Sequence, residues 1–110
     1  MEVIVRSVIL TIYLSENDTC HGRAAYEAIV EYLRDSGIAG ATVLHGFEGY
    51  GVHSKIHTAN ILRLGADLPI VIMAVDTQEK VKNVIPVLRE MVPKELITIQ
   101  DVDILSGENI

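Results

Sequence analysis

The run LPIVIMAV, from Leu68 to Val75, constrains the fold more than any other stretch of the chain. It contains no polar residue, and apolar and polar positions do not alternate along it. A strand that is apolar on both sides is buried on both faces of its sheet. The remaining segments must therefore supply a cover for each face, or leave one face for another molecule.

The segments before this run predict a strand, a helix and a second strand. Residues 3–14 alternate in polarity, as expected of a strand. Asp18 or Thr19 can cap a helix that ends at Gly37. The second strand is ATVLHGF, residues 41–47, and a long segment of residues 48–67 follows it.

After the apolar run, Asp76 and Glu79 resemble a capping box that opens a second helix. Pro86 lies inside this helix and predicts a kink or a restart there. In the last strand, which begins near Glu95, two pairs of apolar residues are out of phase by one residue, and we expect a bulge near Gln100 and Asp101 to restore the register.

The element order is therefore β-α-β-β-α-β, an α+β ferredoxin-like sandwich formed by a single domain, residues 1–110. Both helices lie on one face of the sheet in this topology. The other face carries one side of the apolar run, and soluble monomers rarely expose an apolar surface of that size. The sequence therefore predicts a homo-oligomer, and a cyclic trimer would let three sheets enclose a common core.

Composition excludes several classes of protein. A net charge of −6 argues against nucleic-acid binding, because a phosphate backbone needs a basic surface. Cys20 is the single cysteine, so neither a disulfide framework nor a cysteine-rich zinc site is expected. The lone cysteine favours a reducing, cytoplasmic location.

The long segment contains the chemistry that a bound anion would need. From Gly49 to Ala66 there is no acidic residue. Glycine backbone N–H groups, hydroxyls and positive charges suit an anion site, and they come here from Gly49, Gly51, Ser54, Lys55 and Arg63. Alternatively, the glycines only permit a turn.

Two histidines of this segment, His53 and His57, would share one face of a helix and could bind a metal. His45 shares a strand face with Val43 and Phe47, which favours a packed ring, although a neighbouring chain's His45 could join such a metal site. No nucleophile with a partnering base is recognisable in the sequence, so an enzyme is not expected.

Several motifs together resemble the family known as domain of unknown function 190. They are GRAAY, GIAGATV, GYGVHSKIHT, ILRL and DLPIVI followed by Asp76, and the resemblance extends from Val8 to Ile104. This family is similar to the PII-like trimers, signalling proteins that bind adenine nucleotides in clefts between subunits. The resemblance implies a ferredoxin-like trimer and does not supply a function.

The resemblance to PII proteins also implies site residues. Gly49, Tyr50 and Gly51 match the opening of the PII signalling loop, and His57 precedes a threonine as in that loop. The PII glycine-lysine phosphate loop is absent, and Lys94 in VPKEL is its only stand-in. The expected ligand is therefore AMP or ADP ahead of ATP.

The implied protein is a non-enzymatic sensor whose mobile loop, residues 48–67, regulates a partner such as a membrane transporter or channel. The alternative is a metal-binding trimer of the metal-tolerance type that uses the loop histidines.

Overall fold

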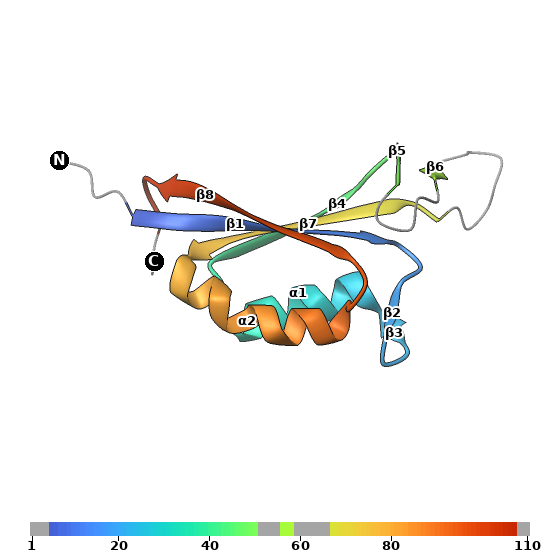
Figure 1. Ribbon diagram of the computed structural model, residues 1–110, viewed down its shortest axis with the longest axis horizontal. Helices are drawn as coiled ribbons and strands as arrows, with labels where there is room; N and C mark the ends of the chain where they lie inside the picture. The colour runs from blue at the N-terminus through green and yellow to red at the C-terminus, as the bar shows by residue number, and fades with distance from the viewer. Residues whose placement is uncertain (1–4, 51–55, 59–66, 108–110) are drawn as a thin grey trace.

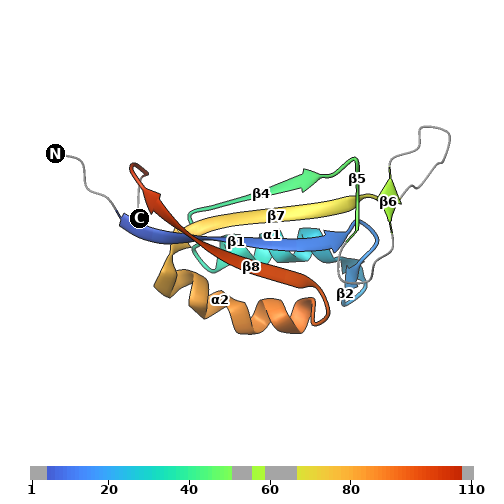
Figure 2. The same ribbon diagram turned by 45° about the horizontal axis from the view of Figure 1, so that its top comes forward.

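The computed structural model describes residues 5–50, 56–58 and 67–107. Four strands form one antiparallel sheet in the order β4-β7-β1-β8, with both helices on the same face (Figures 1 and 2). The sheet strands are β1 (Val5–Ser15), β4 (Gly40–His45), β7 (Pro69–Thr77) and β8 (Leu96–Ile104), and the helices are α1 (Ala25–Asp35) and α2 (Gln78–Met91). The predicted α+β fold with a ferredoxin-like element order is confirmed.

Four two-residue strands form two small ribbons outside this sheet: β2 (Thr19–Cys20), β3 (Arg23–Ala24), β5 (Glu48–Gly49) and β6 (His57–Thr58). The β2–β3 ribbon lies beside α1, on the helix side of the sheet (Figure 1). The β5–β6 ribbon stands at the end of the sheet where β4 ends and β7 begins (Figure 2).

The core lies between the sheet and the helices. Because side chains alternate along a strand, every second residue of β1 and β7 points toward the helices. These residues are almost completely buried, and they are Val8, Leu10, Ile12 and Leu14 of β1 with Ile70, Ile72 and Ala74 of β7. From the helices, the core receives Ala25, Ile29, Leu33, Val81, Val84 and Leu88. Burial of each large side chain contributes about 1.5–3 kcal/mol.

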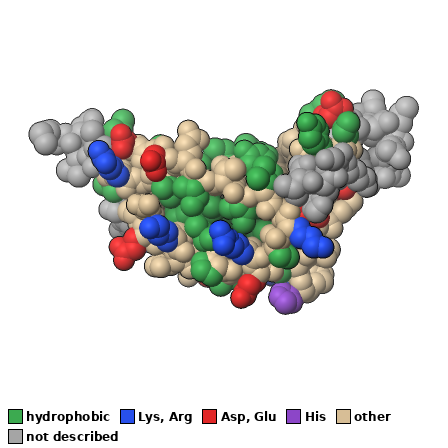
Figure 3. Space-filling view, viewed as in Figure 1, with side chains coloured by type: hydrophobic (Ala, Val, Ile, Leu, Met, Phe, Trp, Pro, Cys, Tyr) green, Lys and Arg blue, Asp and Glu red, His purple; other side chains and the backbone are tan. Residues whose placement is uncertain are grey.

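The opposite face of the sheet has no cover within the described residues. One row of apolar neighbours crosses all four strands there: Leu44, Val71, Tyr13 and Leu96. Three of them are 50% (Leu44), 38% (Tyr13) and 42% (Leu96) exposed, and Met73 nearby is 36% exposed. Figure 3 shows the molecule from the side, with the sheet nearly edge-on above the helices, and hydrophobic side chains are exposed across the middle of this view. The predicted two-sided apolar strand is therefore β7, and the described residues cover only one of its sides.

The start of each helix differs from the sequence prediction. Asp18 and Thr19 do not cap α1, because the β2–β3 ribbon intervenes and turns at His21 (φ 50°) and Gly22 (φ 79°). Ala24 is the N-cap of α1 and provides no side-chain hydrogen bond. Gly37 follows α1 with a φ of 82°, a left-handed conformation that ends the helix as predicted.

The predicted capping box of α2 is also wrong, because Thr77 and not Asp76 is the N-cap. The Thr77 hydroxyl accepts a hydrogen bond from the backbone N–H of Lys80 at 3.4 Å. Asp76 is fully buried. Its carboxylate accepts hydrogen bonds from the N–H of Ala39 at 2.9 Å and of Thr77 at 2.6 Å, and it lies 3.7 Å from the Lys80 ammonium. The Asp76 carboxylate therefore binds the N–H of Ala39, which is distant in the sequence, and Thr77 caps α2 in its place.

Two further irregularities that the sequence predicted, a helix restart at Pro86 and a bulge in β8, are absent. Helix α2 continues from Gln78 to Met91 with Pro86 inside it, so no second helix starts there. β8 pairs with β1 without a bulge, from Leu96 opposite Tyr13 to Ile104 opposite Val5. The change of phase in β8 instead sends its apolar residues to different faces of the sheet: Ile97 and Ile99 on the helix face, Val102 and Ile104 on the open face.

Candidate ligand-binding site

The topology gathers four chain segments at one end of the sheet. Because all neighbouring strands are antiparallel, β1 and β4 end where β7 and β8 begin. A cavity of about 470 Å³ lies at this end. Its lining comes from all four segments: Tyr13, Leu14, Ser15, Asn17 and Asp18; Gly46, Glu48, Gly49 and Tyr50; Asp67, Pro69, Ile70 and Val71; and Glu95. Sites for small ligands typically have volumes of this order.

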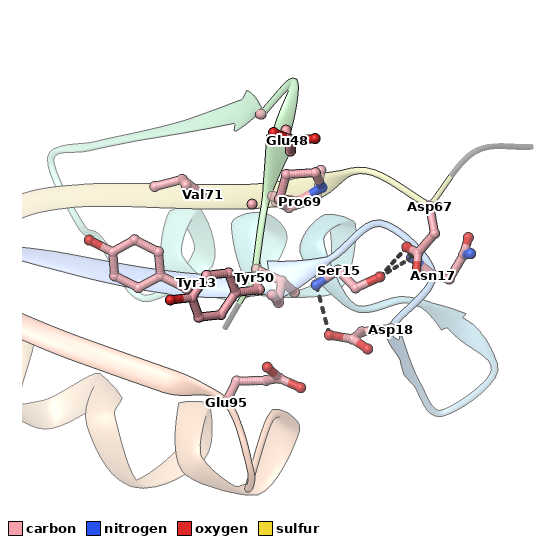
Figure 4. A pocket seen from close by; sticks show the side chains of 14 residues that line it. Tyr13, Ser15, Asn17, Asp18, Glu48, Tyr50, Asp67, Pro69, Val71 and Glu95 are labelled. Atoms are coloured by element: carbon pink, nitrogen blue, oxygen red, sulfur yellow. Dashed lines mark hydrogen bonds between the residues drawn. The ribbon is translucent and has the colours of Figure 1, made fainter. Parts of the chain in front are cut away.

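The floor of the cavity is apolar and its sides carry two aromatic rings (Figure 4). Val71 and Pro69 of β7 lie on the open face beside Tyr13 of β1, and Tyr50 comes from the residue after β5. The Tyr50 side chain is 71% exposed. An exposed ring beside a hollow can stack on a flat ligand without a change of the core.

Gly46 shapes the cavity where β4 leaves the sheet. Its N–H donates to the carbonyl oxygen of Pro69 at 2.7 Å. A Cβ at this position would lie 2.8 Å from Cγ of Pro69, a distance that requires the proline ring to move. Glycine is therefore needed here for close approach of the two segments, rather than for an unusual backbone angle.

Hydrogen bonds fix the polar end of the cavity (Figure 4). The Ser15 hydroxyl donates to the Asp67 carboxylate, and the Asn17 N–H lies 3.3 Å from the same oxygen. The Ser15 N–H donates to the Asp18 carboxylate at 2.9 Å. The turn after β1 is thereby joined to Asp67, which is separated from the start of β7 by Leu68.

A second connection lies next to this one. Backbone and side chain of Glu16 both contact Leu68: the Glu16 N–H donates to the Leu68 carbonyl at 2.8 Å, and the Leu68 N–H lies 3.4 Å from the Glu16 carboxylate. His45 Nε2 lies 3.7 Å from the same carboxylate, and its ring packs edge-on against Tyr26 with centroids 5.8 Å apart. His45 thus contacts Tyr26 and lies near Glu16, but its side chain is 45% exposed and is only partly packed.

The described lining of the cavity is acidic. Its lining includes the carboxylates of Asp18, Glu48, Asp67 and Glu95, and no lysine, arginine or histidine among the described residues. The sequence prediction considered the acid-free stretch after Gly49, whereas these acids come from the segments on either side of it. The described wall therefore supplies oxygen acceptors for hydroxyl or amino groups of a ligand.

The predicted site residues fall into three groups. Gly49 and Tyr50 line the cavity, and Gly49 pairs with His57 in the β5–β6 ribbon. Lys94 is exposed and lines an adjoining hollow of about 340 Å³ that also includes Asp18 and Glu95. The remaining predicted residues lie outside the described part of the chain: Gly51, His53, Ser54, Lys55 and Arg63.

The predicted metal site also stays a prediction, because its histidines lie largely outside the described residues. Among the residues that the structure describes, no group of three or more histidine, cysteine, aspartate or glutamate side chains could hold a metal ion. His53 is outside those residues, and only the backbone of His57 is described.

Within the described parts of the chain, neither helix has the length and apolar character needed to cross a membrane.

Sequence reasoning missed most of the cavity wall. In the sequence, Tyr13 is an ordinary residue of the predicted first strand, Ser15 follows the end of that strand, and Glu95 begins the predicted last strand. The available signal was the topology itself: once the element order was assigned, the ends of the first two strands and the beginnings of the last two had to meet.

Comparison with known proteins identifies the sequence family and the fold of this chain. A family model for DUF190, described as an uncharacterized group of conserved proteins, matches residues 7–104. A UPF0166 protein of Methanocaldococcus jannaschii is 39% identical over 106 residues, covering 96% of this chain and 97% of the relative. A UPF0166 protein of Aquifex aeolicus is 32% identical over 104 residues, covering 93% and 96%.

Solved structures share the fold at low identity. CPII from Thiomonas intermedia K12, a nitrogen regulatory PII-like protein bound to ADP, AMP and bicarbonate, superposes with a TM-score of 0.74 at 18% identity, over 96% of this chain and 94% of CPII. A Thermus thermophilus protein described as PII-like superposes with a TM-score of 0.66 at 16% identity, over 96% and 94%. The chain is therefore a member of the DUF190/UPF0166 family, and its fold is that of the PII-like signalling proteins.

Proposed function

We propose that this protein is a small-molecule sensor, not an enzyme, that binds an adenine nucleotide in the cavity at the β1–β7 end of the sheet. The observation that carries the proposal is this cavity: an apolar floor, two tyrosine rings and fixed carboxylates at one end of a PII-like fold. The solved structure of CPII, which has the same fold, contains bound ADP and AMP.

The chemistry of the wall suits the nucleoside part of such a ligand. A purine has a flat π surface that can stack on Tyr13 or Tyr50, and stacking of a base on an aromatic side chain contributes about 1–3 kcal/mol. Ribose hydroxyls and the adenine amino group are donors, and the carboxylates of the wall are acceptors. The phosphates would then point to Lys94 and to the predicted ligands Lys55 and Arg63 of the long segment.

A second copy of the chain would complete the site. The apolar row on the open face is exposed in the single chain, and it continues into the cavity through Tyr13 and Val71. Burial of this face against other copies would remove the apolar surface from water and close the open side of the cavity. The proposed assembly is the homotrimer that the sequence predicts, with one nucleotide in each cleft between subunits.

The segment of residues 48–67 would transmit the signal. Both its ends belong to the cavity, through Glu48 and Gly49 at one side and Asp67 at the other. A ligand that contacts these residues therefore acts directly on both ends of the segment and can bias the surface that it presents to a partner. The proposed partner is a membrane transporter or channel.

Calorimetric titration tests the proposal. We expect the purified protein to bind at least one of AMP, ADP and ATP, and to bind GMP more weakly. Replacement of Tyr50 by alanine should weaken binding by about fivefold to 100-fold, the loss of one stacking contact. Phe47→Ala is the matched control, because Phe47 is 75% exposed on the same stretch and does not line the cavity. The absence of heat with every adenine nucleotide would refute the proposal.

A further inference from the structure

Three residues that are not among the described lining of the cavity are direct chain neighbours of residues that line it: Glu16, His45 and Leu68. They belong to the turn after β1, to the end of β4 and to the residue before β7. Their lining neighbours are Ser15 and Asn17, Gly46, and Asp67 and Pro69, respectively. Contacts among these three residues therefore act on three of the four segments that form the cavity.

The closest of these contacts joins Glu16 to Leu68. The Glu16 N–H donates to the Leu68 carbonyl oxygen at 2.8 Å, and the Leu68 N–H lies 3.4 Å from Oε2 of the Glu16 carboxylate. In the adjoining register pair of the sheet, Ser15 is opposite Pro69, and a proline has no N–H to donate. Glu16 therefore extends the pairing of β1 and β7 past a residue that cannot donate a hydrogen bond.

The other carboxylate oxygen of Glu16 connects to β4. Its Oε1 lies 3.7 Å from Nε2 of His45, whose ring packs against Tyr26 of α1. The residue after His45 is Gly46, and the Gly46 N–H donates to the Pro69 carbonyl oxygen at 2.7 Å. The Glu16 and His45 side chains are 33% and 45% exposed, and partly exposed pairs contribute little to stability. The contact therefore matters for where the segments lie more than for overall stability.

We infer that Glu16 is a positioning residue of the cavity: its carboxylate, shared between Leu68 and His45, holds the ends of β1 and β4 beside the beginning of β7. This inference rests on the proposed function and adds to it a residue on which nucleotide binding depends through its neighbours. If the carboxylate is removed, the segments of Ser15, Gly46 and Pro69 separate, and the ligand loses contacts on several sides.

The first test measures AMP affinity by calorimetry. Glu16→Ala removes both contacts of the carboxylate and should weaken AMP binding about threefold to tenfold, the range that one hydrogen bond contributes. Glu16→Gln keeps an oxygen acceptor for the Leu68 N–H and should bind AMP within about twofold of the unmodified protein. Glu90→Ala is the matched control, because Glu90 is an exposed acid of α2 outside the described lining. Unchanged AMP affinity in Glu16→Ala would overturn the inference.

The second test asks whether Glu16 and His45 act together. His45→Phe keeps a ring for the contact with Tyr26 and removes the nitrogen that faces Glu16. Alone, it should weaken AMP binding about twofold, because a partly exposed pair is weak. In the Glu16→Ala variant it should have no further effect, since the contact is already lost. Effects of the two changes that multiply would contradict the connection to β4.

The third test needs no ligand. The Gly46 N–H lies where β4 meets β7, so its hydrogen exchange reports local opening of the wall. Glu16→Ala should accelerate this exchange at least about threefold relative to Glu90→Ala, and should leave the exchange of the buried Leu10 unchanged. Equal acceleration at both amides would indicate a general loss of stability and would contradict a positioning role.

The two proposals fail in different ways. If the unmodified protein and Glu16→Ala bind AMP equally, the role of Glu16 is wrong and the sensor proposal is intact. If the unmodified protein binds none of AMP, ADP and ATP, the sensor proposal is wrong, and exchange at Gly46 still decides whether Glu16 holds the segments together.

Discussion

The two faces of the sheet use the same strands for opposite purposes. On the helix face of β1, Leu10 and Ile12 are 0% exposed, whereas Tyr13 on the open face is 38% exposed. β7 shows the same contrast, with Ile72 at 0% and Met73 at 36%. The helix face holds the single chain together. The open face mixes apolar residues such as Val71 and Met73 with Thr11 and Thr42, has no partner among the described residues, and leads into the cavity. Stability and the proposed assembly thus depend on alternate residues of the same strands.

The largest expected effect is loss of assembly when the open face receives a charge. We expect Met73→Lys to convert the proposed trimer into single folded subunits, because each copy would bury an unpaired ammonium group in an apolar interface. Val87→Lys is the matched control, since Val87 is 37% exposed on α2, close to the 36% of Met73. Sedimentation velocity measures the outcome, and trimers that survive Met73→Lys would contradict the assignment of the open face to assembly.

A core truncation measures the other face. Ile12→Ala should lower the free energy of unfolding by about 2–5 kcal/mol, the usual cost of a cavity in a packed core. Ile9→Ala removes the same atoms from the open face of the same strand, where the side chain is partly buried. In the dissociated Met73→Lys variant, Ile9→Ala should lower the free energy of unfolding by less than half as much as Ile12→Ala. Urea unfolding gives both values, and equal losses would mean that the two faces do not differ as described.

Asp76 breaks the pattern of the helix face and offers a third measurement. It follows Ile70, Ile72 and Ala74 on the covered side of β7, and it is charged and fully buried. Asp76→Ala leaves the N–H of Ala39 without its acceptor and should cost about 1–3 kcal/mol. Asp103→Ala, at an exposed position of β8, is the control. Equal stability of the two variants would show that the Asp76 carboxylate does not stabilise the fold by connecting the start of β4 to the start of α2.

What the sequence predicted, and what it did not, follows from the range of each interaction. The strand faces were predictable because alternation in β1 is a local pattern. The choice of Thr77 over Asp76 as N-cap was not, because it depends on Ala39, which is distant in the chain. Gly49 and Tyr50 were predicted site residues on a local motif.

The acidic wall could not be predicted in the same way, because Asp18, Glu48, Asp67 and Glu95 meet only through the order of the strands. No periodicity joins them, and each is separated from the next by a complete element or by the long segment.

The smallest expected effect concerns an ion pair on the helix side of the molecule. Arg23 of β3 lies 2.8 Å from Glu31 of α1, with both side chains 49% exposed. The hydrogen bond from Arg23, followed by its charge, lowers the pKa of the Glu31 carboxyl. Because the folded pKa is below the unfolded one, the associated stability is present above the unfolded pKa and is lost as the pH falls through the folded pKa. An exposed pair of this kind contributes little to stability.

Carbon-13 NMR titration of the Glu31 carboxyl measures this effect. Arg23→Gln should raise the Glu31 pKa toward its ordinary value, and Arg34→Gln should raise it less, because Arg34 acts on Glu31 only through its charge and is the weaker cause. The same titration distinguishes the two faces of the sheet. If copies associate through the open face, the Glu31 pKa is equal in the assembled protein and in the dissociated Met73→Lys variant. A pKa that changes with assembly would instead place a subunit contact on the helix side, against the role assigned to the open face.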